Sequence, residues 1–248
     1  MIRVEGVSKR FRDNVVLDRV SVDVPDGATT VILGPSGVGK TVLLRIMAGL
    51  QAPDEGQVFH DGRRIRFGRF ADNRGLTGGL GYVFQGGALF DSMTVGENVA
   101  FGIKNRDHMA RADIDAIVEH SLEQVGLTDV AHLLPAELSG GMKKRVAIAR
   151  VIAKKPTIIM YDEPTTGLDP IMADIINDLV IKVGGNKEIT SIVITHDMVS
   201  AYKISDKIAV LFEGKIIETG SPEEIKNTRN AVVRQFIEGK ADGPIKIR

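Results

Sequence analysis

The sequence predicts an α/β fold with a mainly parallel core sheet, an antiparallel β subdomain and an inserted helical subdomain. Short runs rich in apolar and β-branched residues, typical of buried strands, occur at 29–34, 157–162, 190–196 and 207–217. A segment of helical spacing at 170–183 separates the second run from the third. This alternation of strand, helix and strand favours parallel pairing with helices packed on the sheet.

The first part of the chain carries strand patterns of a different kind. Residues 15–24 alternate apolar and polar side chains, as a strand with one buried face does. Residues 56–65 contain the turn pair Asp61 and Gly62, which predicts a hairpin. We therefore expect an antiparallel β subdomain beside the core sheet.

The middle of the chain, from about 87 to 155, has helical character and predicts the inserted subdomain. Within it, residues 107–126 place apolar side chains on one face of a helix. We expect residues 1–222 to form one domain, followed at 223–248 by a C-terminal helix and a tail that contributes to a dimer contact. The apolar positions of the amphipathic segment are Ala110, Ile114, Ile117, Val118, Leu122 and Val125.

The composition excludes several classes of function. The 32 basic residues balance 32 acidic ones, so there is no basic surplus for broad nucleic-acid binding, and we expect no nucleic-acid partner. Without Cys there is neither a disulfide framework nor a thiolate metal site. No apolar run approaches the roughly 20 residues of a membrane-spanning helix. We therefore expect any membrane role to depend on a partner.

Residues 34–41, GPSGVGKT, match the phosphate-binding pattern G-x-x-x-x-G-K-[ST] between an expected strand and an expected helix. Glycines let the backbone N–H groups face an anion, and the following helix adds its positive end. A glycine-rich turn with an incidental lysine is the alternative, which the strand–helix context disfavours. We call residues 34–41 the phosphate cradle and expect it to bind ATP and Mg²⁺. The expected nucleotide contacts are Gly34, Pro35, Ser36, Gly37, Val38, Gly39, Lys40, Thr41 and Val42.

Three further side chains follow expected strands and complete a candidate reaction centre. Asp162 ends an apolar strand, where a carboxylate can hold Mg²⁺ together with the Thr41 hydroxyl. Glu163 is placed to activate the attacking water. His196 closes another strand and is expected to reach the γ-phosphate. Each alone has a plain structural alternative, a solvated strand end or a structural histidine, and the phosphate cradle favours the functional interpretation.

The motifs together resemble those of ATP-binding cassette (ABC) ATPases. Residues 138–142 read LSGGM, similar to the family signature LSGGQ with Met142 in place of glutamine. The order of cradle, Gln85, signature, the Asp-Glu pair, Asp169 and the closing histidine spans most of the chain and follows the family order. LSGG alone would indicate only a Ser-capped helix start, which also suits anion binding.

The resemblance implies a role for several more residues. Phe11 would stack on the adenine ring, although a core position is the alternative. Gln85 would contact Mg²⁺ or the attacking water, and Asp169 would help to couple two sites across a homodimer. The γ-phosphate of the ATP on the other subunit would be bound by Ser139, Gly140 and Gly141. In this arrangement two copies enclose two ATP molecules, and closure and hydrolysis drive a membrane partner.

Three segments also resemble ATPases of the Mla type, which serve MCE-protein phospholipid transporters of bacteria. They are residues 84–101, residues 137–145 and the tail 233–248, of which the tail is the most distinctive because nucleotide chemistry does not require it. Its structural alternative is a polar terminus. The resemblance implies an integral-membrane permease and an MCE-domain protein as partners, and a peripheral position at the cytoplasmic face of the inner membrane.

Three other interpretations compete with this one. An ABC transporter ATPase for another solute, such as an amino acid, shares every catalytic residue and differs in the tail and the partners. Non-transport ABC proteins typically carry two cassettes, long coiled coils or Cys clusters, none of which the sequence has. A metabolic kinase with a phosphate cradle would leave the signature and His196 without a role.

Overall fold

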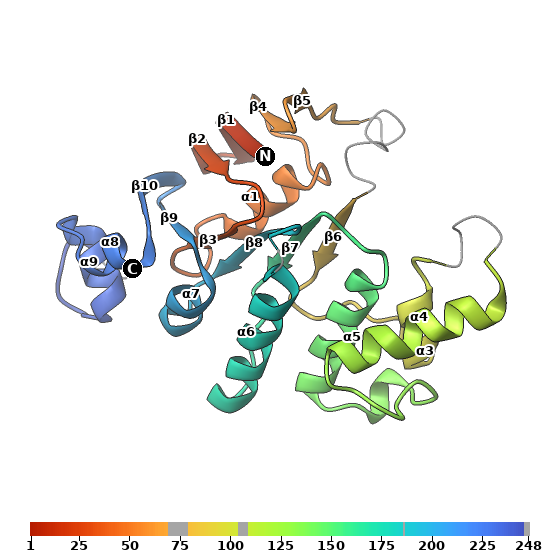
Figure 1. Cartoon of the computed structure of the whole chain (residues 1–248). Coiled ribbons are helices and arrows are strands. Elements are labelled where there is room, and N and C mark those ends of the chain that lie inside the picture. Colours follow the sequence, from red (N-terminus) through yellow and green to blue (C-terminus); the bar gives the residue numbers. More distant parts are fainter. Residues whose placement is uncertain (69–78, 104–108, 186, 246–248) are drawn as a thin grey trace.

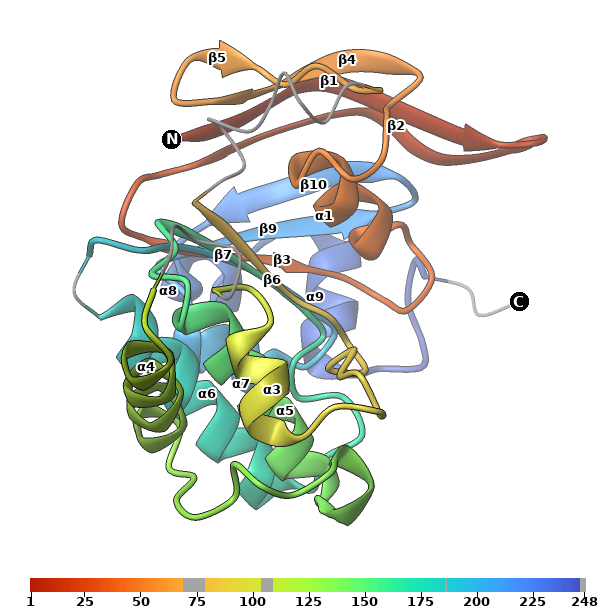
Figure 2. The same cartoon turned by 90° about the vertical axis from the view of Figure 1, so that its right-hand side faces the viewer.

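The computed structural model describes residues 1–68, 79–103, 109–185 and 187–245. None of the helices within these ranges is long and apolar enough to cross a membrane. The helices and strands form layers on either side of a central sheet (Figures 1 and 2).

The central sheet has six strands in the order β10-β9-β3-β8-β7-β6. Every neighbouring pair from β9 to β6 is parallel, and β10 pairs with β9 antiparallel through a turn at Glu213 and Gly214. The expected mainly parallel sheet is therefore confirmed. In chain order its strands are β3 (Thr29–Leu33), β6 (Leu80–Val83), β7 (Ile158–Asp162), β8 (Thr190–Thr195), β9 (Lys207–Phe212) and β10 (Lys215–Gly220).

A second, antiparallel sheet has the order β2-β1-β4-β5. It lies across α1 (Lys40–Met47), which occupies the space between the two sheets (Figure 2). Leu43 and Met47 of α1 are fully buried in one cluster with Val4 of the antiparallel sheet and Ile192 of the central sheet. This layer fixes the helix that follows the phosphate cradle. The strands are β1 (Ile2–Phe11), β2 (Asn14–Val24), β4 (Glu55–His60) and β5 (Arg63–Arg64).

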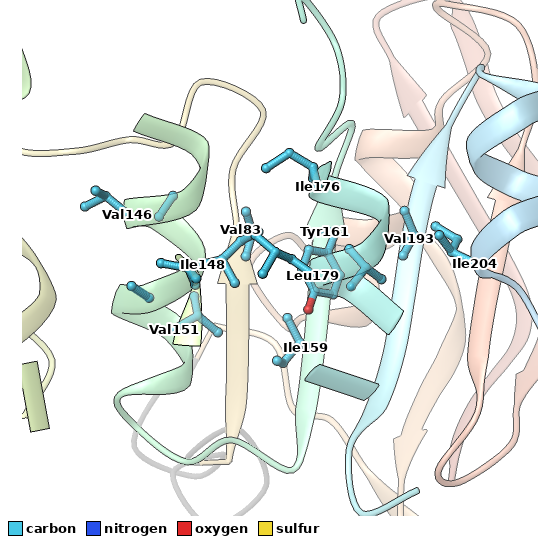
Figure 3. Packing of buried hydrophobic residues seen from close by; sticks show 14 of the residues in the cluster. Val83, Val146, Ile148, Val151, Ile159, Tyr161, Ile176, Leu179, Val193 and Ile204 are labelled. Carbon is cyan, nitrogen blue, oxygen red and sulfur yellow. The ribbon is translucent and has the colours of Figure 1, made fainter. Parts of the chain in front are cut away.

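Helices cover the other face of the central sheet, with the expected inserted helical segment at one side (Figure 1). Figure 3 shows Ile148 of one helix close to the strand residue Val83. Ile176 of another helix is buried in the same cluster as Tyr161 and Val193. The helix expected at 107–126 spans 111–124, and its first expected residues, 107 and 108, lie outside the described residues. The helices are α3 (Val95–Ala100), α4 (Arg111–Gln124), α5 (Gly140–Ile152), α6 (Pro170–Gly184) and α7 (Met198–Ile204), with a 3-10 turn at Pro135–Glu137.

The C-terminal segment packs on the same core. The boundary expected at 222/223 falls inside α8 (Pro222–Lys226), and Ile225 is fully buried in the cluster beneath the central sheet. Within α9 (Ala231–Glu238), the Gln235 side chain bonds the backbone of the tail: Nε2 donates to the carbonyl of Lys240 at 3.1 Å, and Oε1 accepts from the amide of Ile245 at 2.6 Å. The described tail thus folds back on α9, and its contact with a second copy stays a prediction.

Candidate active site

The phosphate cradle connects β3 to α1, as the sequence pattern predicts. Gly37 and Gly39 have φ values of 81° and 101°, which side-chain-bearing residues rarely adopt. A Cβ on Gly39 would lie 2.8 Å from a methyl group of Val16. Gly39 precedes α1 as its N-cap and has no side chain, so it supplies no side-chain acceptor to the first N–H groups of the helix. Such a helix start suits an anion.

Lys40 is the buried cation of the site, with only 5% of the residue exposed. Its Nζ donates to the carbonyls of Gly34 at 2.8 Å and Pro35 at 2.9 Å, and lies 3.2 Å from Oε1 of Glu163. Burial lowers the pKa of Lys40, and the negative charges of Glu163 and Asp162 oppose that shift. The lysine is therefore held at the centre of the cradle, between its carbonyls and the carboxylate beyond it.

Asp162 ends β7 and faces the start of α1. Its Oδ1 accepts a hydrogen bond of 2.9 Å from the Thr41 hydroxyl, and its Oδ2 accepts one of 3.1 Å from the Tyr82 hydroxyl. Burial, followed by the charge of Asp162, raises the pKa of Tyr82, which therefore stays a donor. A hydroxyl and a carboxylate joined in this way are hard oxygen donors, the type that Mg²⁺ prefers. The residues present thus fit a magnesium ion.

Glu163 follows Asp162 and is 7% exposed. Its backbone is left-handed, with φ 49°, a conformation that non-glycine residues adopt at a cost. Oε2 accepts a hydrogen bond of 3.1 Å from the Thr166 hydroxyl and lies 2.9 Å from Nδ1 of His196, while Oε1 faces Lys40. The carboxylate is thus oriented from three sides.

These groups meet because β3, β7 and β8 are parallel neighbours whose carboxyl ends lie at one edge of the sheet. There Lys40, Thr41 and Glu163 border a pocket of about 390 Å³, whereas Asp162 is not among its lining residues and reaches it through its hydrogen bond with Thr41. Phe11, at the end of β1, lines its rim with 47% of the residue exposed, and Lys9 Nζ lies 5.7 Å from the ring centroid. The pocket is lined by Phe11, Val16, Ser36, Gly37, Gly39, Lys40, Thr41, Val42, Gln85 and Glu163.

Other expected site residues lie elsewhere. Val38 packs against the core beneath the antiparallel sheet. Gly34 and Pro35 do not line the pocket, but their carbonyls accept hydrogen bonds from Lys40. Asp169 caps α6, accepting from the amides of residues 171 and 172 at 3.0 Å each. His196 reaches Glu163, yet it borders a neighbouring pocket together with the 165–168 loop.

The signature segment, residues 138–142, is separate from the nucleotide pocket. Ser139 caps α5 by accepting a hydrogen bond of 3.3 Å from the amide of Met142. Ser139 and Gly140 are exposed, whereas Gly141 is buried, with Met172 of α6 occupying the space where a Cβ would lie. None of these residues is among those that line the pocket around Lys40 in the described part of the chain.

Sequence reasoning missed two side chains that bond the carboxylates of the candidate reaction centre. Tyr82 bonds Asp162 from β6, and Thr166 bonds Glu163 from the loop that follows it. Thr166 lies three residues after Glu163, and this short spacing was the signal in the sequence that its hydroxyl could reach the Glu163 carboxylate. Tyr82 gave none, because its role depends on the pairing of β6 with β7.

Comparison with known proteins places these features in one family. The family described as "ABC transporter" matches residues 17–166. The chain is 37% identical over its full length, and over 94% of the relative, to the intermembrane phospholipid transport system ATP-binding protein MlaF of Haemophilus influenzae. It is 40% identical to protein TRIGALACTOSYLDIACYLGLYCEROL 3, chloroplastic, of Arabidopsis thaliana, covering 99% of this chain and 76% of that protein.

A solved structure leads to the same family. The dimeric structure of the ATP-binding cassette MJ0796 in a post-hydrolysis state, bound to ADP and Pi, superposes with a TM-score of 0.82 at 30% identity. The match covers 90% of this chain and 99% of that chain. The protein therefore belongs to the ABC transporter family and is an ABC ATPase, a nucleotide-binding enzyme that hydrolyses ATP.

Proposed function

We propose that the protein is the ATPase subunit that powers phospholipid transport between bacterial membranes. The observation that carries this proposal is the match to an intermembrane phospholipid transport ATP-binding protein along the whole chain, distinctive tail included. The cradle, strand ends and signature support ATP hydrolysis but carry no information about cargo.

The proposed chemistry assigns each buried group one task. The cradle amides and Lys40 bind the phosphates of ATP and hold the γ-phosphoryl group in place. Glu163 takes a proton from the attacking water through its carboxylate, and Thr166 and His196 orient that carboxylate. Phe11 supplies a face on which adenine stacks.

The proposed magnesium site consists of Thr41, Asp162 and Gln85. Bound Mg²⁺ would neutralise charge that develops on the β- and γ-phosphate oxygens. The hydrogen bond of 2.9 Å between Thr41 and Asp162 supports this donor set, because both oxygens are already directed to one place. Tyr82 fixes the second oxygen of Asp162 and so limits how that carboxylate can rotate.

The working unit is proposed to be a homodimer with two ATP molecules at its interface. Ser139, Gly140 and Gly141 of each copy would bind the γ-phosphate in the pocket of the other, and Asp169 would couple the two sites. The exposure of Ser139 and Gly140, and the dimeric state of the similar cassette MJ0796, support this arrangement. The tail at 223–248 is proposed to add a contact between the copies.

The membrane partners are proposed to be a permease and an MCE-domain lipid-binding protein, with the ATPase at the cytoplasmic face of the inner membrane. A groove of about 520 Å³ is lined in part by residues on either side of Gln85 in the chain, and Phe84, Phe90 and Phe101 border it. An apolar groove of this kind suits a helix of the permease. No nucleic-acid partner is proposed, given the neutral charge.

The test is purification of the tagged protein from gently solubilised native membranes, with identification of the proteins and lipids that accompany it. We expect a multi-span permease, an MCE-domain protein and phospholipid. The matched control is a variant with two charges in the groove, Phe84→Glu with Phe90→Glu, which should lose the permease while retaining ATP binding. A permease accompanied by a soluble solute-binding protein would keep the ATPase and overturn the lipid assignment.

A further inference from the structure

Lys144 is a buried cation on α5, two residues beyond the signature segment. Only 8% of the residue is exposed. Its Nζ donates to the backbone carbonyl of Gln85 and, at 3.4 Å, to the backbone carbonyl of Glu163. Burial lowers the pKa of Lys144, and the charges of Asp162 and Glu163 oppose that shift. Among the described residues no carboxylate lies within ion-pair distance, so carbonyl oxygens are the acceptors that compensate its burial.

The acceptor at Glu163 matters because the backbone there is strained. Glu163 has φ 49°, and such a conformation persists only where surrounding contacts impose it. The amide of Glu163 donates to the carbonyl of Ile194 at 3.0 Å, and its carbonyl accepts from the amide of Thr166 at 3.3 Å as well as from Lys144. Lys144 is the side-chain donor to that carbonyl, and it comes from the helix that the signature begins.

The acceptor at Gln85 connects the same side chain to a second element of the site. Gln85 lines the pocket, while its carbonyl points back to Lys144. Arg150, further along α5, donates to the carbonyls of Gly87 and Ala88 at 2.7 Å each. Arg150 therefore binds the segment after Gln85 to α5, while Lys144 binds Gln85 itself. Of the two cations, only Lys144 also reaches Glu163.

We propose that Lys144 is a positioning residue for hydrolysis, which holds the backbones of Glu163 and Gln85 in register with the signature helix. The inference rests on the proposed role of Glu163 as general base. Movement of α5, which carries Ser139 at its start, is transmitted through one ammonium group to the two residues that face the attacking water.

The test compares ATP turnover and nucleotide affinity in four variants. Lys144→Met keeps the apolar stem and removes the donor; we expect kcat to fall about 10- to 100-fold, as for a misplaced catalytic group, with the Kd for ATP unchanged. Lys144→Arg keeps charge and donors and should restore most of the turnover. Lys143→Met is the matched control, since Lys143 is partly exposed and makes no side-chain hydrogen bond among the described residues. Arg150→Met should leave kcat of the isolated ATPase near its normal value.

A double-mutant cycle with Glu163→Gln separates positioning from general destabilisation. If Lys144 acts through Glu163, then Lys144→Met should cause little further loss in the Glu163→Gln background. An equal fractional loss in both backgrounds, or normal kcat in Lys144→Met, would overturn the inference. Should the melting temperature show that Lys144→Met does not fold, Lys144→Gln replaces it, with a smaller loss expected to vanish in the same background. Near-normal turnover in Glu163→Gln alone would instead refute the proposed role of Glu163.

Discussion

The nucleotide pocket and the signature segment belong to one chain but differ in how complete they are. In and next to the pocket, Lys40, Asp162 and Glu163 are each less than 10% exposed, and each already has partners within hydrogen-bond or ion-pair distance. In the signature, Ser139 and Gly140 are exposed, and the Ser139 hydroxyl bonds only the amide of Met142 among the residues that the structure describes.

The difference agrees with the roles proposed for the two regions. Buried charges in the pocket are stable because they compensate one another, so the pocket can be preorganised within one chain. The signature presents a serine and helix N–H groups to solvent, which is an incomplete site for an anion. An ATPase whose second set of phosphate contacts faces outward depends on another copy to complete its reaction centre, as proposed above.

The largest expected effect on the pocket comes from the variant Glu163→Gln. Removal of the proposed general base should slow ATP hydrolysis by about 10²- to 10⁴-fold. ATP binding should survive, because the amide keeps the shape of the side chain and leaves Lys40 and the cradle intact. Steady-state turnover and nucleotide binding to the purified variant measure the two effects separately.

Glu188→Gln is the matched control for that prediction, because the same change at an exposed residue leaves every site contact in place. Turnover close to normal in Glu163→Gln would remove Glu163 from the role of base. Loss of ATP binding together with turnover would instead make Glu163 a structural partner of Lys40, which the distance of 3.2 Å between them would then explain.

Mixing two inactive variants, one altered in the pocket and one in the signature, tests whether the two regions act together across a dimer. Lys40→Met removes the phosphate contact of the pocket, and Ser139→Arg blocks the signature, so each homodimer should lose at least about 100-fold in turnover. Mixed dimers contain one site with both an intact pocket and an intact signature. We therefore expect activity to reappear when the two inactive proteins are combined.

The amount of recovered activity should rise and fall with the ratio of the two proteins and be greatest near equal amounts. A mixture no more active than its components would contradict a site shared between copies. Ser139 also caps α5, which contributes about 1 kcal/mol to stability, so the melting temperature of Ser139→Arg must be checked first.

The sheet and the pocket were predictable because their signals are local. Continuous apolar runs such as those ending at Asp162 and Thr195 occur where strands are buried on both faces, and the cradle pattern lies directly between strand and helix. The boundary expected at 222/223 lies inside α8 in the structure. This helix begins at Pro222, and its Ile225 is buried in the main core. Only tertiary packing reveals that continuity.

The same distinction explains which site residues sequence reasoning missed. Asp162 and Glu163 follow a strand and could be assigned from their position. Their neighbours reach them through the fold: Tyr82 through strand pairing, Lys144 through helix packing and Thr166 through a short loop. A lysine within a helix usually indicates an exposed face, so no signal in the sequence indicated the role of Lys144. The positions of the candidate side chains at the strand ends could thus be predicted from the sequence, whereas the neighbours that contact them could be identified only from the fold.

The smallest expected effect concerns the rim of the pocket, at Phe11. Phe11→Ala should weaken ATP binding about 10-fold, the equivalent of roughly 1.4 kcal/mol and within the range of aromatic stacking, while Phe11→Tyr should bind normally because it keeps the aromatic face. The melting temperature should change little, since nearly half of the residue, 47%, is exposed. Lys9→Met is the control, because Lys9 Nζ lies 5.7 Å from the ring centroid and its loss changes charge without removing the ring. If Phe11→Ala lowered stability and left the Kd for ATP unchanged, the ring would be part of the core rather than of the site. If Lys9→Met alone weakened ATP binding, the charge of Lys9 and not the ring of Phe11 would bind the nucleotide at this end of the pocket.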